Sequence, residues 1–233
     1  MKLKASLHLH SHEDAEDSAI VDYTLYELID FAASNGFKVL ASTCHGKNIC
    51  ASEHIEYARR LGILLIPGVE IQIAGHRHLL ILNGGVAADK VGTFEELRAF
   101  RAVHPEAFII APHPNHGTPS TLSLKNIIKY RGLFDAVEHS WFYSKLFNPN
   151  RRAERLSKNI SLPFIATADA HTLQYIKTDY AVIDAIDLSA ASVFKAIRAE
   201  KFKNVTRPKT NFQLVGFLIW MKFRDIKSFF SGK

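Results

Sequence analysis

Residues 5–10 read ASLHLH and run directly into the polar stretch SHEDAED at residues 11–17, which indicates a strand followed by a loop. Residues 24–35 (TLYELIDFAASN) then place apolar side chains at helical spacing, and Gly36 follows as a typical helix stop. A second short apolar run, KVLAST, occupies residues 38–43. This order of strand, loop, helix and strand is the first repeat of an α/β fold.

The same alternation continues along the rest of the chain. Further strands are predicted at residues 63–66, 78–82, 107–111, 135–138, 164–167 and 181–183. Further helices are predicted at residues 52–61, 93–103, 122–130, 151–158 and 190–200. About seven or eight strands interleaved with helices favour a parallel α/β barrel over a β-sandwich. An open, doubly wound sheet is the alternative, which the strand count alone does not exclude.

The overall composition fits one domain in a reducing compartment. A chain of 233 residues with 47% hydrophobic residues can bury a single substantial core. The two cysteines, Cys44 and Cys50, and the absence of an N-terminal segment resembling a signal peptide predict a cytoplasmic protein without disulfides. The formal net charge of +6 favours anionic partners, because a positive field concentrates phosphate groups near the surface.

The last residues differ in pattern from the predicted barrel. An apolar run, LVGFLIWM at residues 214–221, precedes the basic segment KFRDIKSFF at residues 222–230. The apolar run is shorter than the roughly 18 to 20 residues that a membrane span needs. We therefore predict a barrel at residues 1–206 and a helical tail at residues 207–233 that packs on the barrel. A contact between two copies of the chain and a helix on a membrane surface are the alternatives for the tail.

The first predicted strand ends in a cluster of histidines. In a parallel barrel, the residues just past the C-terminal ends of the strands face one common rim, where barrel enzymes keep their active sites. His8, His10 and His12 lie at this position. Because alternate residues of an extended chain point the same way, His8 and His10 are suited to bind one metal ion together. Asp14 and Asp17 follow in the loop and add carboxylates to the same rim.

Later strand ends also carry an imidazole or a carboxylate. They provide His45 with Lys47, Glu70, His113 with His116, Glu138 with His139, and Asp169 with His171. Singly, each has an ordinary structural explanation, such as a surface hydrogen bond or a helix cap. Together they would repel one another or stay unsatisfied unless a cation gathered them. Imidazole with carboxylate, and no thiolate cluster, suits Zn, Mn or Fe, and so many donors predict two or three ions.

These motifs, in this order, resemble the polymerase and histidinol phosphatase (PHP) superfamily. The resemblance covers residues 3–184 and is carried by His8 and His10 as HxH, His45, Glu70 in GVE, His113, and Asp169 with His171 as the terminal Asp-x-His. It implies a distorted, TIM-like barrel of seven β/α units that holds two or three metal ions. Members commonly have Asp or Asn before the second-block histidine, where this chain has Cys44.

The resemblance also implies three sets of ligands. The first metal would take His8, His10, Glu70 and Asp169. The second would share Glu70 and add His113 and either Glu138 or His139. The third would take His45, His171 and either Asp14 or Asp17, because a first loop longer than usual leaves both aspartates in competition.

The predicted activity is hydrolysis of a phosphate ester. A water held between two metals loses its proton near neutral pH, and the hydroxide attacks phosphorus in line. Lys47, Arg77 and His116 lie in predicted rim loops and are candidates for binding phosphate. His171 and His116 are the candidates for a general acid. The expected substrate is a phosphorylated small molecule or a nucleotide.

Three other functions remain open. A nuclease acting on RNA or DNA ends would use the same site, and the positive charge favours it, but the cluster Trp141, Phe142 and Tyr143 has only Lys145 beside it. An amidohydrolase also begins with HxH but usually has a bridging lysine, where this chain has Glu70. A non-catalytic barrel would serve as a scaffold for a partner. The sequence does not identify the substrate, the native metal or the oligomeric state.

Overall fold

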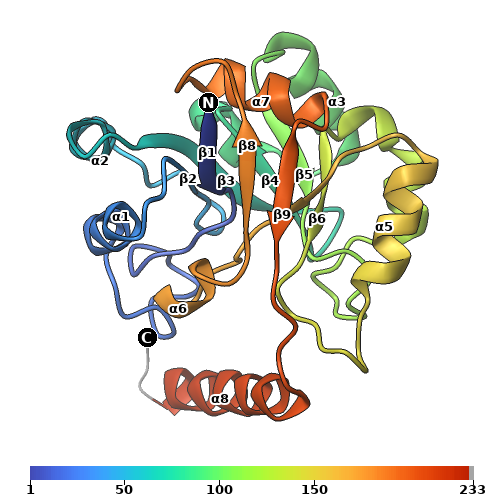
Figure 1. Ribbon diagram of the computed structural model, residues 1–233. Coiled ribbons are helices and arrows are strands. Elements are labelled where there is room, and N and C mark those ends of the chain that lie inside the picture. Colours follow the sequence, from blue (N-terminus) through green and yellow to red (C-terminus); the bar gives the residue numbers. More distant parts are fainter. Residues whose placement is uncertain (231–233) are drawn as a thin grey trace.

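The strands of the protein form one sheet that curls into a barrel (Figure 1). The computed structural model describes the backbone of residues 1–230 and the side chains of residues 1–220. The strands are β1 (Lys2–Ser6), β2 (Val39–Ser42), β3 (Leu64–Ile73), β4 (Arg77–Leu82), β5 (Phe108–Ala111), β6 (Ala136–His139), β7 (Phe164–Ala166), β8 (Tyr180–Asp184) and β9 (Phe202–Val205).

Helices separate most of these strands. The α-helices are α1 (Leu25–Ser34), α2 (Ser52–Arg60), α3 (Phe94–Val103), α4 (Leu124–Lys129), α5 (Asn150–Asn159), α6 (Leu173–Ile176), α7 (Ala190–Arg198) and α8 (Asn211–Phe230). Two 3-10 helices are η1 (Gly85–Lys90) and η2 (Arg131–Leu133). Local sequence sets several starts: at α1, Thr24 and Glu27 form a reciprocal capping box that satisfies free amides of the first turn.

The sheet has mixed strand directions, which corrects the prediction of a parallel barrel. Its strand order is β7-β6-β5-β4-β3-β2-β1-β8-β9, and the pairs β1·β8, β3·β4, β4·β5 and β8·β9 are antiparallel. Strands β3 and β4 are antiparallel because a turn of three residues joins them, and a turn this short leaves no room for the crossover helix that parallel strands need. In this turn, Ala74 and Gly75 both have positive φ, 49° and 101°.

Strand β3 is longer than the predicted run at residues 63–66. Pro67 and Gly68 resemble a strand break in the sequence, yet β3 continues through them to Ile73. Gly68 is needed because a Cβ at this position would lie 2.8 Å from Leu82 Cδ2. The glycine therefore lets β3 pass between its two neighbours, and a substitution here would push the strands apart.

The two edges of the sheet meet without a full ladder of hydrogen bonds. The side-chain amide of Asn204 in β9 donates to the carbonyl of Phe164 in β7, and its oxygen accepts from the amide of Ala166, both at 2.8 Å. Four residues past β7, Ala170 forms a parallel bridge with Leu9. These contacts nearly close the barrel, so the open, doubly wound alternative does not apply.

Apolar side chains fill the barrel interior. One buried cluster contains residues from all strands from β1 to β8, together with Val193, Phe194 and Ile197 of α7, which close the barrel at the end away from the histidines. Leu7 belongs to this interior cluster, whereas Leu9 packs with the helix α1 on the outside. The alternation of side chains therefore changes phase just past β1.

Helix α8 lies across the opposite end of the barrel from the N-terminus (Figure 1). The segment before it is fixed by Lys209, whose backbone bridges Ser144 and whose buried ammonium group donates to the carboxylate of Asp179. Leu214 is buried and Phe217 contacts Trp141, with ring centroids 4.9 Å apart. No helix in the described part of the chain is long and apolar enough to span a membrane.

Candidate metal centre

Four side chains aim their donor atoms at one point at the barrel rim. The Nε2 atoms of His8 and His10 lie 3.1 Å apart, and Glu70 Oε2 lies 2.9 Å and 3.3 Å from them. Asp169 Oδ1 lies 3.4 Å from both nitrogens. We call His8, His10, Glu70 and Asp169 the central group. It coincides with the first ligand set implied by the sequence.

Buried carboxylates hold the far sides of the two central imidazoles. His8 Nδ1 donates to Glu138 Oε2 at 2.8 Å, and His10 Nδ1 donates to Asp14 Oδ2 at 2.9 Å. A carboxylate behind a histidine fixes the proton on one nitrogen and leaves the other as a metal donor. Glu138 Oε1 is also buried and has no hydrogen-bond partner. Such an orphaned oxygen is unfavourable by about 1–3 kcal/mol unless a further group reaches it.

A second group of donors includes a histidine that the sequence analysis missed. Glu70 Oε1 lies 2.8 Å from His78 Nδ1 and 3.2 Å from His113 Nε2. We call Glu70, His78 and His113 the hairpin group. His78 pairs with Gln72 across the β3·β4 ladder, which puts it on the same face as Glu70. The signal was the turn AGH at residues 74–76, which predicts a hairpin and so fixes this register.

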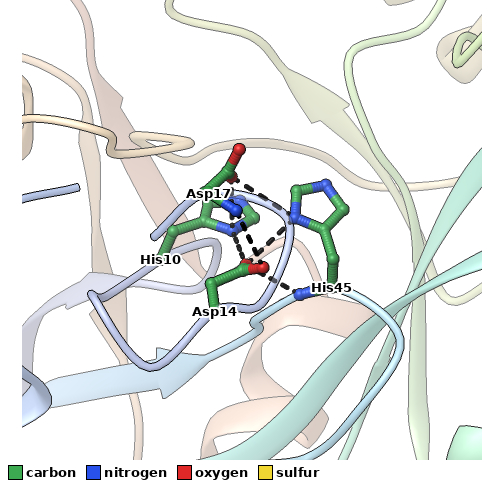
Figure 2. Close-up of side chains that lie close together, drawn as sticks. All are labelled: His10, Asp14, Asp17 and His45. Carbon is green, nitrogen blue, oxygen red and sulfur yellow. Dashed lines mark hydrogen bonds and ion pairs between the residues drawn. The ribbon is translucent and has the colours of Figure 1, made fainter. Parts of the chain in front are cut away.

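A third group surrounds Asp17, which lies in the loop after β1. Asp17 Oδ2 lies 3.0 Å from His171 Nε2 and 3.3 Å from His45 Nδ1. We call Asp17, His45 and His171 the loop group, and Figure 2 shows two of its members beside His10 and Asp14. Asp14 has a different environment, since its oxygens accept from the backbone amides of Glu16 and His45. Asp14 Oδ2 also lies 3.0 Å from His45 Nδ1, so both aspartates are candidate ligands beside the loop group.

The chemistry of these donors fits divalent cations. Imidazole nitrogens and carboxylate oxygens from all three groups lie within 4.8 Å of one another in overlapping sets. Burial by itself would lower the pKa of His45, but the charge of Glu70 and the hydrogen bonds to Asp14 and Asp17 raise this pKa to about 10. The same balance raises the pKa of His8 and His10. Without an ion, protonated imidazoles balance the charge of the ionised carboxylates, and a bound cation would displace those protons.

Two of the candidate ligands have a strained backbone. His113 and Asp169 both have positive φ, 28° and 42°, a region that residues other than glycine adopt at a cost of about 1–3 kcal/mol. Such strain persists only where the surroundings enforce it. Here it turns the two side chains toward Glu70 and the central histidines.

Several residues proposed from sequence lie outside the cluster, and these assignments are corrected by the geometry. His139 packs its ring against Tyr143 and Phe164, because neighbouring residues of a strand point to opposite faces and Glu138 takes the inward one. Lys47 is exposed and does not line the cavity. Arg77 donates to the carbonyl of Ala74 within the hairpin turn.

His116 lies at the cavity but is held by backbone. Its Nδ1 lies 2.8 Å from the carbonyl oxygen of His113, and its Nε2 lies 3.2 Å from that of Phe142. Burial lowers its pKa. Both ring nitrogens of His116 therefore face carbonyl groups, whereas His171, which also lines the cavity, directs Nε2 to the carboxylate of Asp17.

A cavity of about 430 Å³ opens directly above the donors. The candidate ligands Glu70, His113 and Asp169 form its floor, and Phe142 and Phe217 form part of its wall. This volume is within the range of small-molecule sites, about 300–1,000 Å³. The arrangement combines a polar, acidic floor with an apolar side.

A barrel whose rim gathers histidines and carboxylates in this way defines a class of metal-binding proteins. The chain belongs to the PHP domain family, whose model matches residues 6–205. This match confirms the resemblance inferred from the motifs. The match ends at Val205, so α8 lies beyond it. A search of curated proteins found no match.

Solved structures share the fold at low sequence identity. A two-domain protein from Bacteroides vulgatus, described as containing a predicted PHP-like metal-dependent phosphoesterase, has a TM-score of 0.66 and 18% identity over 89% of this chain. This chain spans 65% of that protein, just under two thirds. PsfC from Pseudomonas syringae has a TM-score of 0.62 and 14% identity, with 96% of this chain and 98% of PsfC covered.

A third similar structure is described as an amidohydrolase from Chromobacterium violaceum with bound sulfate and no metal. Its TM-score is 0.54 at 16% identity, with 72% of this chain and 87% of that chain covered. At such identities the likeness establishes the shared fold. The chemistry of this chain therefore has to be argued from its own residues.

Proposed function

We propose that this chain is a metal-dependent hydrolase of phosphate esters, with its active site at the barrel rim. The observation that carries the proposal is the position of Glu70, whose Oε2 faces the central group and whose Oε1 faces the hairpin group. A carboxylate with each oxygen directed at a different set of imidazoles is suited to bridge two ions. The loop group offers a third site, so we propose two or three ions of Zn, Mn or Fe.

Ions held at such a cluster supply a water of lowered pKa and neutralise charge on the phosphoryl oxygens. The residues of the chain provide the orientation. Glu138 and Asp14 keep protons on the Nδ1 atoms of His8 and His10, so that the Nε2 atoms face inward. With ions at the central and hairpin groups alone, His171 is our candidate to donate a proton to the leaving oxygen, because it lines the cavity and its Nε2 faces Asp17.

The test is turnover of 4-nitrophenyl phosphate by protein loaded with Mn or Zn. We expect hydrolysis by the wild-type protein and its loss in His10→Ala, because His10 belongs to the central group. His76→Ala is the matched control, since His76 lies exposed in the β3–β4 turn. Equal turnover by His10→Ala and wild type, or no turnover of any ester in a broad phosphatase panel, would refute the proposal.

The nuclease and amidohydrolase alternatives are separated by the choice of substrate. End-labelled oligonucleotides and mononucleotides belong in the same panel as the aryl phosphate. Faster cleavage of oligonucleotides than of mononucleotides would favour the nuclease. Hydrolysis of amides without hydrolysis of phosphate esters would favour the amidohydrolase.

A further inference from the structure

Helix α8 contributes directly to the cavity above the metal-site residues. Phe217 and Leu218 line the cavity, although both belong to a segment beyond the family match. The ring of Phe217 lies 6.4 Å from the ring of His171, measured between centroids. A group held against Phe217 is therefore close to the loop group.

Aromatic residues of the barrel support Phe217 from behind. Its ring meets Trp141 edge to face at 4.9 Å and lies 6.0 Å from Phe142. Trp141 is itself buried and stacked on Tyr175 at 4.1 Å. This packing places Phe217 on a rigid base, and the buried ion pair of Lys209 anchors the segment that leads to it.

Charge in the cavity is distributed unevenly. Among the described residues that line it, none is lysine or arginine, and Glu16 and Asp17 add carboxylates to the lining. Glu16 is exposed. Thr118, Ser120 and Ser140 contribute uncharged hydroxyl residues to the lining of the cavity. Among the described lining residues, a second anionic group on the substrate would find no lysine or arginine and would face the carboxylate of Glu16.

From this combination we propose that α8 forms the specificity wall of the site, with Phe217 packing on an uncharged, aromatic leaving group of the phosphate ester. The inference rests on the proposed phosphoesterase function and narrows its substrate class. The floor receives the phosphate, and the wall selects what is attached to it. The cavity of about 430 Å³ has room for a phosphate and one fused ring system.

The experiment compares three esters with metal-loaded protein: 1-naphthyl phosphate, glycerol 2-phosphate and 3-phosphoglycerate, whose leaving group carries a carboxylate. We expect kcat/KM to fall in that order for the wild type. Phe217→Ala should lower kcat/KM for the naphthyl ester by about tenfold, mainly through KM, and lower it much less for glycerol 2-phosphate. Phe212→Ala is the matched control, because Phe212 lies on the same helix with 86% of its surface exposed.

A second variant separates the effect of the aromatic ring from that of an apolar side chain. Phe217→Leu retains an apolar side chain without the ring, and it should show an intermediate loss while metal content and melting temperature match the wild type. A preference for 3-phosphoglycerate, or an unchanged naphthyl preference in both Phe217 variants, would overturn the proposal.

If metal-loaded protein hydrolyses none of the esters, the phosphoesterase function fails while the wall can still be tested by binding. Calorimetry with phenylphosphonate and methylphosphonate then replaces turnover. About tenfold tighter binding of phenylphosphonate, lost in Phe217→Ala and kept in Phe212→Ala, would support the wall. Equal affinities for the two phosphonates would overturn it.

Discussion

Replacing Glu138 by glutamine tests how the central group is built. In the wild type, the buried Glu138 carboxylate accepts a hydrogen bond from His8 Nδ1 at 2.8 Å. Glutamine keeps the shape and can still accept this hydrogen bond, but without the charge. A hydrogen bond to a charged group contributes about 1.5–3 kcal/mol and a neutral one about 0.5–1.5 kcal/mol. The difference of about 1–1.5 kcal/mol predicts roughly tenfold weaker metal binding, at the lower end of the usual range for such residues.

The assay is a competition titration of metal-free protein with Zn and a chromophoric chelator. Glu138→Gln should bind the same number of ions as wild type, with about tenfold lower affinity for one of them. Glu154→Gln is the control, because Glu154 is exposed on α5. Loss of one whole equivalent of metal would show that Glu138 is itself a ligand, through its unpaired Oε1, and wild-type affinity would show that His8 needs no such support.

Three other predictions follow from charged groups of the described structure. Metal binding should release protons at pH 7, because neighbouring carboxylates outweigh burial and raise the pKa of His45 to about 10 in the ion-free cluster. Calorimetry in buffers of different ionisation enthalpy measures this release. A binding enthalpy that does not depend on the buffer would contradict it. Burial would raise the pKa of Asp135, but hydrogen bonds from Arg101 and a backbone amide outweigh burial and lower it, so its stabilising effect is complete at neutral pH and is lost as pH falls below about 4. Asp135→Asn should therefore lower the urea midpoint at pH 7, and its midpoint should fall less than that of the wild type between pH 5 and pH 3. Parallel plots of urea midpoint against pH for the two proteins would refute this reasoning. Lys209→Ala leaves the buried Asp179 without its cation and should lower the free energy of unfolding by about 3–5 kcal/mol, with partial recovery in Lys209→Ala combined with Asp179→Ala; an unchanged urea midpoint in the single variant would contradict it.

Candidate ligands that are close together in the sequence could be predicted from short-range patterns. Alternation along the first strand predicted that His8 and His10 act together, and the structure brings their Nε2 atoms within 3.1 Å. Both histidines face inward because the phase of alternation changes just past β1, and metal binding by the pair stays a prediction. The α/β barrel was predicted correctly as a class, because alternating apolar runs report strand and helix directly.

Features that depend on pairing between strands were not accessible in the same way. His78 was missed because its position depends on the β3·β4 register. Pro67 and Gly68 indicated an end to the strand after residue 66, whereas β3 continues to Ile73. The choice between Glu138 and His139 depends on which face of β6 is turned inward, which the short segment VEH leaves open. The position of Phe217 at the cavity depends on contacts between α8 and distant barrel residues such as Trp141. The amphipathic pattern of the tail does not show which surface it covers.

The central claim is that donors from His8 to His171 share cations at one rim. The most direct measurement is an anomalous-scattering crystal structure of protein grown with Mn or Zn. The account predicts peaks between the Nε2 atoms of His8 and His10, between His78 and His113, and beside Asp17, His45 and His171. A structure in which these imidazoles stay bonded to carboxylates and no peak occurs among them, with the metal in excess, would contradict it.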